Sequence, residues 1–257
     1  MPPTCGSTRH VLLVADRFAQ FADGEQVFAV SDFTARAARG ETTESGAGWV
    51  IHAGQGIERS DLDVLRTISV VDRGSGIRLA SSAAMLGQPV PPATVHKSRA
   101  ENVLLADLRN PSRDHCAARL RIHADNELVL DHSSGKHVQG MVIIEAMRQI
   151  CTAQFETSYR PELPHHDYAG LWHRMDLTFE SFLFALNADV LAEITNVDVS
   201  RKTSLRFRAS TSVRQNGEVV ASAEIEYSMV DKARMDVLER YRAARAARAH
   251  LAGPADR

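Results

Sequence analysis

Short apolar runs alternate with amphipathic stretches along the first third of the chain. They predict strands at His10–Ala15, Gln26–Val30 and Trp49–Ala53, and helices at Asp32–Arg39 and Asp61–Ile68. Ser31 and Ser60 are the expected N-caps of the two helices, and Gly40 is the expected stop of the first. Alternating strands and helices are typical of a small α/β unit.

A proline-rich segment marks the clearest boundary. Pro89, Pro91 and Pro92 lie within GQPVPPATVHKS. Prolines restrict the backbone and remove amide donors, so no helix is expected to pass through this segment. We therefore expect a small α/β domain over residues 1–90, a second domain over 95–230, and a C-terminal helix and tail over 231–257.

The second part of the chain has a different hydrophobic pattern, with longer runs of alternating apolar and polar residues on both sides of one helix. The predicted strands are Asn102–Leu108, Ala117–His123, Leu171–Phe179, Val190–Val197, Ser204–Val213 and Val219–Met229. The Asn-Gly pair inside Gln215–Glu218 predicts a tight hairpin. Helices are predicted over residues 138–159 and, after Asp231 as a cap, over Lys232–His250.

The helix predicted over 138–159 is apolar on nearly every face, which is typical of a buried helix. One buried helix surrounded by an antiparallel sheet describes a hotdog fold. The expected fold class is therefore α+β, a hotdog preceded by a small α/β domain. Glu145 and Arg148 interrupt the apolar helix at i,i+3 spacing, on one face. Buried charges are costly unless paired, so two readings stay open: a structural ion pair, or a catalytic acid/base pair.

The composition of the chain excludes several classes of protein. The 257 residues are 44% hydrophobic and 24% charged, with a net charge of −2. This excludes a disordered chain and offers no electrostatic case for nucleic-acid binding. Cys5, Cys116 and Cys151 form no CxxC, which fits a reducing compartment. The N-terminus has no apolar signal segment, and no apolar run is long enough for a membrane helix, so we expect a cytoplasmic protein without a membrane partner.

The stretch Asp131–Gln149 carries a family resemblance. It reads D-H, a short loop, H-V-Q-G-M, three apolar residues and E-A-M-R-Q. This resembles the A-factor biosynthesis hotdog family, with Gln139 where that pattern has proline. The segments Val95–Lys97 and Glu101–Leu105 look similar to the family's entry strand, and the resemblance covers about 95–230. The motif is also related to the hydroxyacyl-carrier-protein dehydratase signature, but dehydratases usually carry a small residue at the position of Arg148.

The resemblance implies an acyltransferase. Such an enzyme moves a β-ketoacyl group from an acyl-carrier-protein or CoA thioester to a small hydroxyl acceptor such as dihydroxyacetone phosphate, on the way to a γ-butyrolactone. It implies no cofactor. Familiar members look like two fused hotdog units, so a single unit implies a homodimer. A hotdog dehydratase or thioesterase, and a non-catalytic thioester-binding module, remain as alternatives.

Site residues follow from the chemistry of acyl transfer, which needs a base, oxyanion donors and exclusion of water. Glu145 is the expected base, because burial should raise the pKa of its carboxyl group. Arg148 and His132 complete the expected catalytic set. Amides at a helix start can hold an oxyanion. The expected substrate-binding residues are Asp131, His137, Gly140, Met141, Gln149 and Lys97.

Three further features carry weaker expectations. His165-His166-Asp167 is metal-like in composition, but a solvated loop is the preferred interpretation and no metal is expected. Glycines between Gly46 and Gly56 do not form the phosphate-binding pattern, so turns are preferred over nucleotide binding. The C-terminal helix is rich in arginine, which fits either a solvated face or a contact with an acidic carrier protein.

Overall fold

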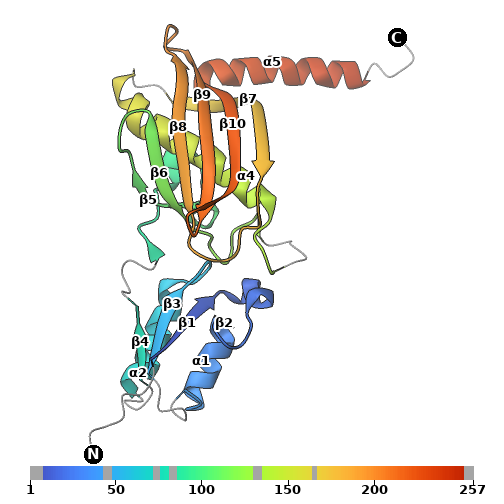
Figure 1. Cartoon of the computed structure of the whole chain (residues 1–257). Coiled ribbons are helices and arrows are strands. Elements are labelled where there is room, and N and C mark those ends of the chain that lie inside the picture. The colour runs from blue at the N-terminus through green and yellow to red at the C-terminus, as the bar shows by residue number, and fades with distance from the viewer. Residues whose placement is uncertain are drawn as a thin grey trace, which may run out of the picture.

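The computed structural model describes residues 8–42, 48–71, 76–80, 86–129, 135–163 and 167–251. Within these ranges the chain forms two β-sheets (Figure 1). A four-stranded sheet has the order β2-β1-β3-β4, and a six-stranded sheet has the order β5-β6-β8-β9-β10-β7. None of the helices in these ranges is long and apolar enough to cross a membrane.

The four-stranded sheet is parallel and carries two helices. Its elements are β1 (Arg9–Val14), the 3₁₀ turn η1 (Asp16–Phe21), β2 (Val27–Ala29), α1 (Val30–Ala38), β3 (Trp49–Ala53), α2 (Arg59–Val71) and β4 (Ile77–Leu79). Leu13 and Ile51 on the strands pack with Phe33, Leu62 and Leu65 on the helices, and all five are almost fully buried. The predicted strand–helix alternation is thus confirmed.

The two predicted helix caps are wrong. Ser31 and Ser60 lie inside the helices, because each helix begins earlier than expected. The amide of Ser31 donates to Asp16 Oδ1 at 3.1 Å, so a carboxylate from a distant turn satisfies a first-turn donor of α1. At α2, the amide of Glu58 donates to Asp61 Oδ2 at 2.8 Å. Gly40, by contrast, follows α1 with a φ of 77°, the left-handed conformation typical of a helix end.

The six-stranded sheet is antiparallel and curves around one helix. Two short turns, η2 (Pro92–Val95) and η3 (Ala100–Asn102), lead into it. Its elements are β5 (Leu105–Arg109), β6 (His115–Leu120), α4 (Gly140–Gln154), the π-helical turn η4 (Phe155–Tyr159), the 3₁₀ turn η5 (Arg160–Glu162), β7 (Tyr168–Phe179), β8 (Asp189–Asp198), β9 (Ser204–Gln215) and β10 (Glu218–Asp231). Helix α4 lies against one face of the sheet (Figure 1). The predicted α+β hotdog fold is confirmed.

The β9–β10 hairpin confirms the Asn-Gly turn. Asn216 and Gly217 have φ angles of 53° and 87°. Two consecutive positive φ angles are typical of a type I′ turn, whose twist matches that of the flanking strands. The turn pairs Gln215 with Glu218 and sets the register of the longest ladder of the sheet.

The core of the hotdog is the apolar surface of α4. Val142, Ala146, Met147, Ile150 and Ala153 are fully buried. They pack in one cluster with inward-facing side chains of the sheet. Full burial of a large apolar side chain is worth about 1.5–3 kcal/mol, so this helix contributes a large share of the stability.

Helix α5 (Lys232–Leu251) follows β10, and Asp231 caps its start as predicted. The carboxylate oxygen Oδ1 of Asp231 accepts the amide of Arg234 at 3.0 Å.

The carboxyl ends of β1 and β3 abut the hotdog unit. Val14, Ala15 and Phe18 belong to the same apolar cluster as α4. A Cβ placed on Gly54 would come within 2.6 Å of the carbonyl oxygen of Ala185, so only glycine permits this approach. Open α/β sheets bind ligands outside the carboxyl ends of their strands, and here that region is filled by protein. This favours packing over nucleotide binding as the reason for the glycines.

Gln55 fastens this junction with three hydrogen bonds. The side chain is buried, with 4% of its surface exposed. Its Nε2 donates to the carbonyl oxygens of Leu120 at 3.1 Å and Leu186 at 2.9 Å. Its Oε1 accepts the amide of Ile122 at 2.8 Å. The side chain therefore satisfies backbone groups at the end of β6, just after it, and before β8.

Replacing Gln55 by leucine is expected to lower the free energy of unfolding by about 3 kcal/mol, since it leaves three buried backbone groups without partners. Urea unfolding followed by circular dichroism measures this. Gln26→Leu is the matched control, because Gln26 is exposed. Equal stability of the two variants would contradict the role given to Gln55.

Candidate functional site

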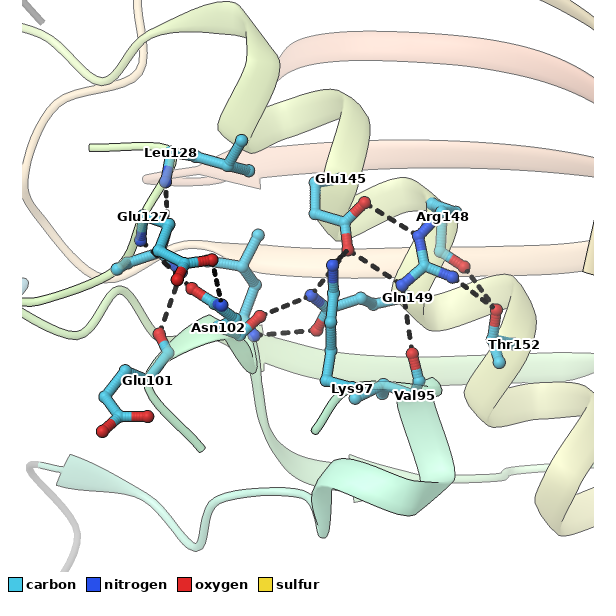
Figure 2. A network of polar contacts seen from close by, with 12 residues as sticks. Val95, Lys97, Glu101, Asn102, Glu127, Leu128, Glu145, Arg148, Gln149 and Thr152 are labelled. Atoms are coloured by element: carbon cyan, nitrogen blue, oxygen red, sulfur yellow. Dashed lines mark hydrogen bonds and ion pairs between the residues drawn. The ribbon is translucent and has the colours of Figure 1, made fainter. Parts of the chain in front are cut away.

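The carboxylate of Glu145 lies between two cations on the outer side of α4 (Figure 2). Arg148 binds it in a bidentate manner, with Nε 2.8 Å from Oε2 and Nη2 2.8 Å from Oε1. Lys97 Nζ lies 2.7 Å from Oε1. The side chain of Glu145 is 16% exposed and those of Arg148 and Lys97 are 25% and 28% exposed. The predicted Glu145–Arg148 pair is confirmed, and Lys97 joins it from a segment 48 residues earlier.

Gln149 is fully buried, and its side-chain amide forms the hydrogen bonds that a backbone peptide group of a neighbouring strand would form. Its Nε2 donates to Glu145 Oε1 at 3.0 Å and to the carbonyl oxygen of Asn102 at 2.8 Å. Its Oε1 accepts the amide of Leu104 at 2.8 Å. The side chain thereby satisfies one donor and one acceptor of the segment that leads into β5. The expected role of Gln149 in substrate binding stays a prediction.

These contacts tie residues 92–104, which we call the strap, to the outer side of α4 and η4. Arg148 Nη2 donates to the carbonyl oxygen of Val95 at 3.0 Å. Further along, His96 Nε2 lies 2.7 Å from Glu156 Oε1. His96 has a φ of 53°, which lets neighbouring side chains of the strap reach different turns of the helix. The E-A-M-R-Q motif is thus the anchor of the strap.

The pKa of Glu145 departs from the expectation. Burial does act to raise the pKa of this carboxyl group, as expected. The hydrogen bonds and charge of Arg148, with Lys97 and Gln149, outweigh burial and hold the pKa below its usual value. The expected raised pKa is therefore wrong. Glu145 is an ionised, fully engaged carboxylate, which is a weaker base than a carboxylate whose pKa is raised.

A cavity of about 450 Å³ lies at the N-terminal end of α4. His137 and Gly140 line it together with Ile143 and with residues at and after the end of β7: Phe179, Glu180, Ser181, Phe182 and Leu183. Phe179 and Phe182 are 51% and 66% exposed, so the mouth is apolar. The ring of His137 lies 5.0 Å from that of Phe182.

The predicted site residues therefore form two groups. Gly140 and Ile143 face the cavity, whereas Glu145 lies about 200° further round the helix than Ile143. Glu145, Arg148, Gln149 and Lys97 contact one another at the strap and do not line the cavity. Met141 is 54% exposed and belongs to neither group. Asp131, His132, His165 and His166 lie outside the described residues.

The first turn of α4 places backbone donors beside the cavity. Gln139 is the N-cap and makes no side-chain cap hydrogen bond. The amides of Gly140 and Met141 have no acceptor within the helix, since an acceptor would lie four residues earlier. A Cβ on Gly140 would come within 2.9 Å of Phe179 Cζ, so glycine lets the cavity reach the backbone. The arrangement suits an anion or a polarised carbonyl oxygen.

Sequence reasoning missed part of this cavity. Phe179 was placed on a strand, and Phe182 and Leu183 were given no role. The available signal was the aromatic density of TFESFLF, because solvated loops seldom carry so many apolar side chains. The pairing of Lys97 with Glu145 had no local signal, since it depends on the path of the strap.

Cys151 is a poor candidate for thiol chemistry. Burial raises the pKa of the fully buried Cys151 thiol to about 12, so it stays protonated and unreactive. No group of three or more His, Cys, Asp or Glu side chains suited to a metal ion occurs among the described residues.

Glu145→Gln is expected to lose stability at neutral pH, and the loss should shrink in acid. The pKa of folded Glu145 lies below its ordinary value of 4.5, so the ionised group stabilises the fold above about that pH. The contribution disappears as the pH falls through the lowered pKa of the folded state. Urea unfolding from pH 7 to about pH 3 measures this. Exposed Glu224 supplies the control Glu224→Gln; a gap that stays constant with pH would contradict the analysis.

Comparisons with known proteins complete the description of the site. Several solved structures are similar to this chain. The dehydratase heterocomplex ApeI:P from Xenorhabdus doucetiae is 19% identical over 55% of this chain and 91% of that one, with a TM-score of 0.44. A putative thioesterase from Ralstonia eutropha is 14% identical over 55% of this chain and 92% of that one, with a TM-score of 0.37, and a hypothetical thioesterase with coenzyme A from Streptococcus pneumoniae is 10% identical over 49% of this chain and 85% of that one, with a TM-score of 0.35. Among curated proteins, no sequence matches this chain. The family profile described as "A-factor biosynthesis hotdog domain" matches residues 80–231, and the chain therefore belongs to this family.

Proposed function

We propose that this protein is an acyltransferase that moves a β-ketoacyl group from a thioester to a hydroxyl acceptor. The observation that carries the proposal is the cavity at the start of α4, which combines an imidazole, the backbone amides of a helix start and an apolar mouth. Membership of the A-factor biosynthesis hotdog family supports a thioester as the donor. The proposed carrier of the acyl group is an acyl carrier protein or CoA, which places the reaction in the cytoplasm.

The cavity accounts for donor binding. Ile143, Phe179, Phe182 and Leu183 supply an apolar lining for an acyl chain. A volume of about 450 Å³ lies within the usual range for small-molecule sites. The thioester carbonyl oxygen would point to the amides at the start of α4, where the positive end of the helix dipole stabilises developing negative charge.

His137 is the proposed base, because it lines the same cavity. Histidine is the side chain best suited to take and return a proton near neutral pH. In the proposed step, the acceptor hydroxyl gives its proton to His137 as its oxygen bonds to the thioester carbon. The carbon–sulfur bond then breaks, and the leaving thiolate takes the proton from the imidazolium. The products are an ester and a free thiol.

Glu145 is a positioning residue in this proposal. Its carboxylate faces the strap and is held by Arg148, Lys97 and Gln149, away from the cavity lining. Its function is to fix α4 against the strap, so that Gly140 keeps its place beside the cavity. The acceptor remains a small hydroxyl compound such as dihydroxyacetone phosphate.

Incubation of the protein with a β-ketoacyl carrier-protein or thiol mimic, with and without dihydroxyacetone phosphate, tests the reaction by mass spectrometry. Ester formation that requires the acceptor is expected. Free acid would identify a thioesterase, loss of water from a β-hydroxyacyl thioester would identify a dehydratase, and saturable binding of unchanged thioester would identify a binding module. Each of these three results would overturn the proposed transfer.

Variants assign the base in the same assay. His137→Asn should lower kcat by about 10²–10⁴-fold, the usual contribution of a general base. His115→Asn, at an exposed histidine of β6, is the matched control. Glu145→Gln should lower stability more than kcat. A folded Glu145→Gln protein with a greater loss of kcat than His137→Asn would transfer the base role to Glu145.

A homodimer is part of the proposal. β7 is an edge strand of the six-stranded sheet, paired with β10 on one side only among the described strands. It is 12 residues long and exposes Leu171 and Phe179, and Phe182 follows it. Long exposed edges with apolar side chains pair readily with a second strand. Pairing of two β7 strands would bring a second copy to the mouth of the cavity, where Phe179 and Phe182 need cover.

Sedimentation velocity tests the dimer, and the wild-type protein is expected to sediment as twice the 28.2 kDa chain. Leu171→Asp should shift it to the monomer, because a charge would be placed in the paired edge. Val197→Asp on β8 is the control, since Val197 has a similar exposure of 36%. A monomeric wild-type protein, or equal dissociation of both variants, would contradict the proposed interface.

A further inference from the structure

Helix α5 stands away from the rest of the protein. It runs for 20 residues from Lys232 to Leu251 and extends beyond the edge of the six-stranded sheet (Figure 1). Only Met235 is buried among its residues. Its first turn is fixed, since the amide of Lys232 donates to the carbonyl oxygen of Asp167 at 2.8 Å and Arg234 Nη1 donates to Thr203 Oγ1 at 3.3 Å. The proposed catalytic role uses no residue of this helix.

The projecting part exposes apolar side chains that a solvated helix does not need. Val237 is 60% exposed, Leu238 39% and Tyr241 67%. With 100° per residue, these three side chains fall in one sector of about 100°, and Arg245 and Arg248 fall in the same sector. We call these five residues the arginine stripe. The acidic residues of α5, Asp236 and Glu239, lie on the opposite side of the helix.

The charge of the helix contrasts with that of the whole chain. α5 holds five arginines and one lysine against two acidic residues, whereas the chain has a net charge of −2. The alanines and arginines between them favour helix strongly, which explains why α5 forms with so few contacts. The stripe is therefore a stable, basic and partly apolar surface.

We propose that the arginine stripe docks an acidic helix of a partner protein. Helices that pack side by side bury apolar residues in the seam, and charged residues on the same face pair with opposite charges on the partner helix. Val237, Leu238 and Tyr241 supply the seam. Arg245 and Arg248 supply cations that match carboxylates on the partner, and such complementarity gives both speed and selectivity of association. The proposal is independent of the acyltransferase assignment.

The composition of the stripe disfavours other occupants. Helices that lie on membranes keep their cations on the polar face, whereas Arg245 and Arg248 share the face of Val237 and Tyr241. A second copy of the same stripe would bring arginines against arginines. Nucleic acid would meet an apolar centre and a chain of net negative charge.

Fluorescence anisotropy with the full chain tests the proposal. The probe is a labelled helical peptide with a leucine stripe flanked by glutamates, and a second peptide replaces the glutamates by glutamines. We expect salt-sensitive binding of the glutamate peptide and binding of the glutamine peptide that is at least about tenfold weaker.

A charge-matched pair of variants locates the surface. Arg245→Glu/Arg248→Glu reverses the charge within the stripe, and Arg59→Glu/Arg78→Glu makes the same change in net charge at exposed arginines outside α5. The first pair should weaken binding by about tenfold or more, and the second should change it by less than about threefold. Far-UV circular dichroism checks that α5 remains helical, and Val237→Ser/Tyr241→Ser tests the apolar seam in case charge reversal alters the helix.

Several results would overturn the proposal. These are no binding of the glutamate peptide, equal weakening by both charge-reversed pairs, or no weakening by Val237→Ser/Tyr241→Ser. Stripe-dependent binding to phosphatidylglycerol vesicles or to duplex DNA in place of the peptide would also overturn it. So would self-association that the stripe variants abolish, because the occupant would then be a second copy.

Discussion

Burial of α4 imposes the main constraint on this protein. Polar side chains buried with this helix need protein partners, because little water reaches them. Glu145, Arg148 and Gln149 meet this demand together, with the strap as their common partner. The strap in turn fixes the entry into β5, the edge strand opposite β7. The apolar helix and its few polar residues are thus parts of one solution, in which charge fixes the position that apolar packing alone would leave free.

The same constraint separates structure from chemistry along the helix. The middle of α4 packs against the sheet on one side, and Glu145, Arg148 and Gln149 bond to the strap on the other. Its first turn borders the cavity, where backbone amides and His137 lie beside an apolar lining. A fold of this kind can change its reaction through the residues at the helix start and in the loop after β7, while the anchor stays the same. This is why the motif with the most obvious chemical groups is the one that holds the fold.

Local features of the sequence were sufficient for most elements. Trp49–Ala53 forms a strand with the predicted bounds, and the Asn-Gly turn sets the last hairpin. Errors arose where a distant residue decides the outcome. The start of α1 depends on Asp16, and Lys97, which no local pattern connects to Glu145, adds to the lowering of the Glu145 pKa by Arg148. The cavity depends on where residues 179–183 lie relative to α4, and periodicity carries no such information.

The junction at Gln55 has a consequence for the evolution of the chain. Val14, Ala15 and Phe18 share a core with α4, so the parallel sheet closes part of the apolar surface of the hotdog unit. The carboxyl ends of its strands, where a free α/β unit would bind a ligand, are occupied by this contact. A unit used in this way offers an interface where a free unit would offer a binding site. The first strands of the chain act as a built-in partner of the hotdog, and their sequence can change only as fast as the surface that they cover.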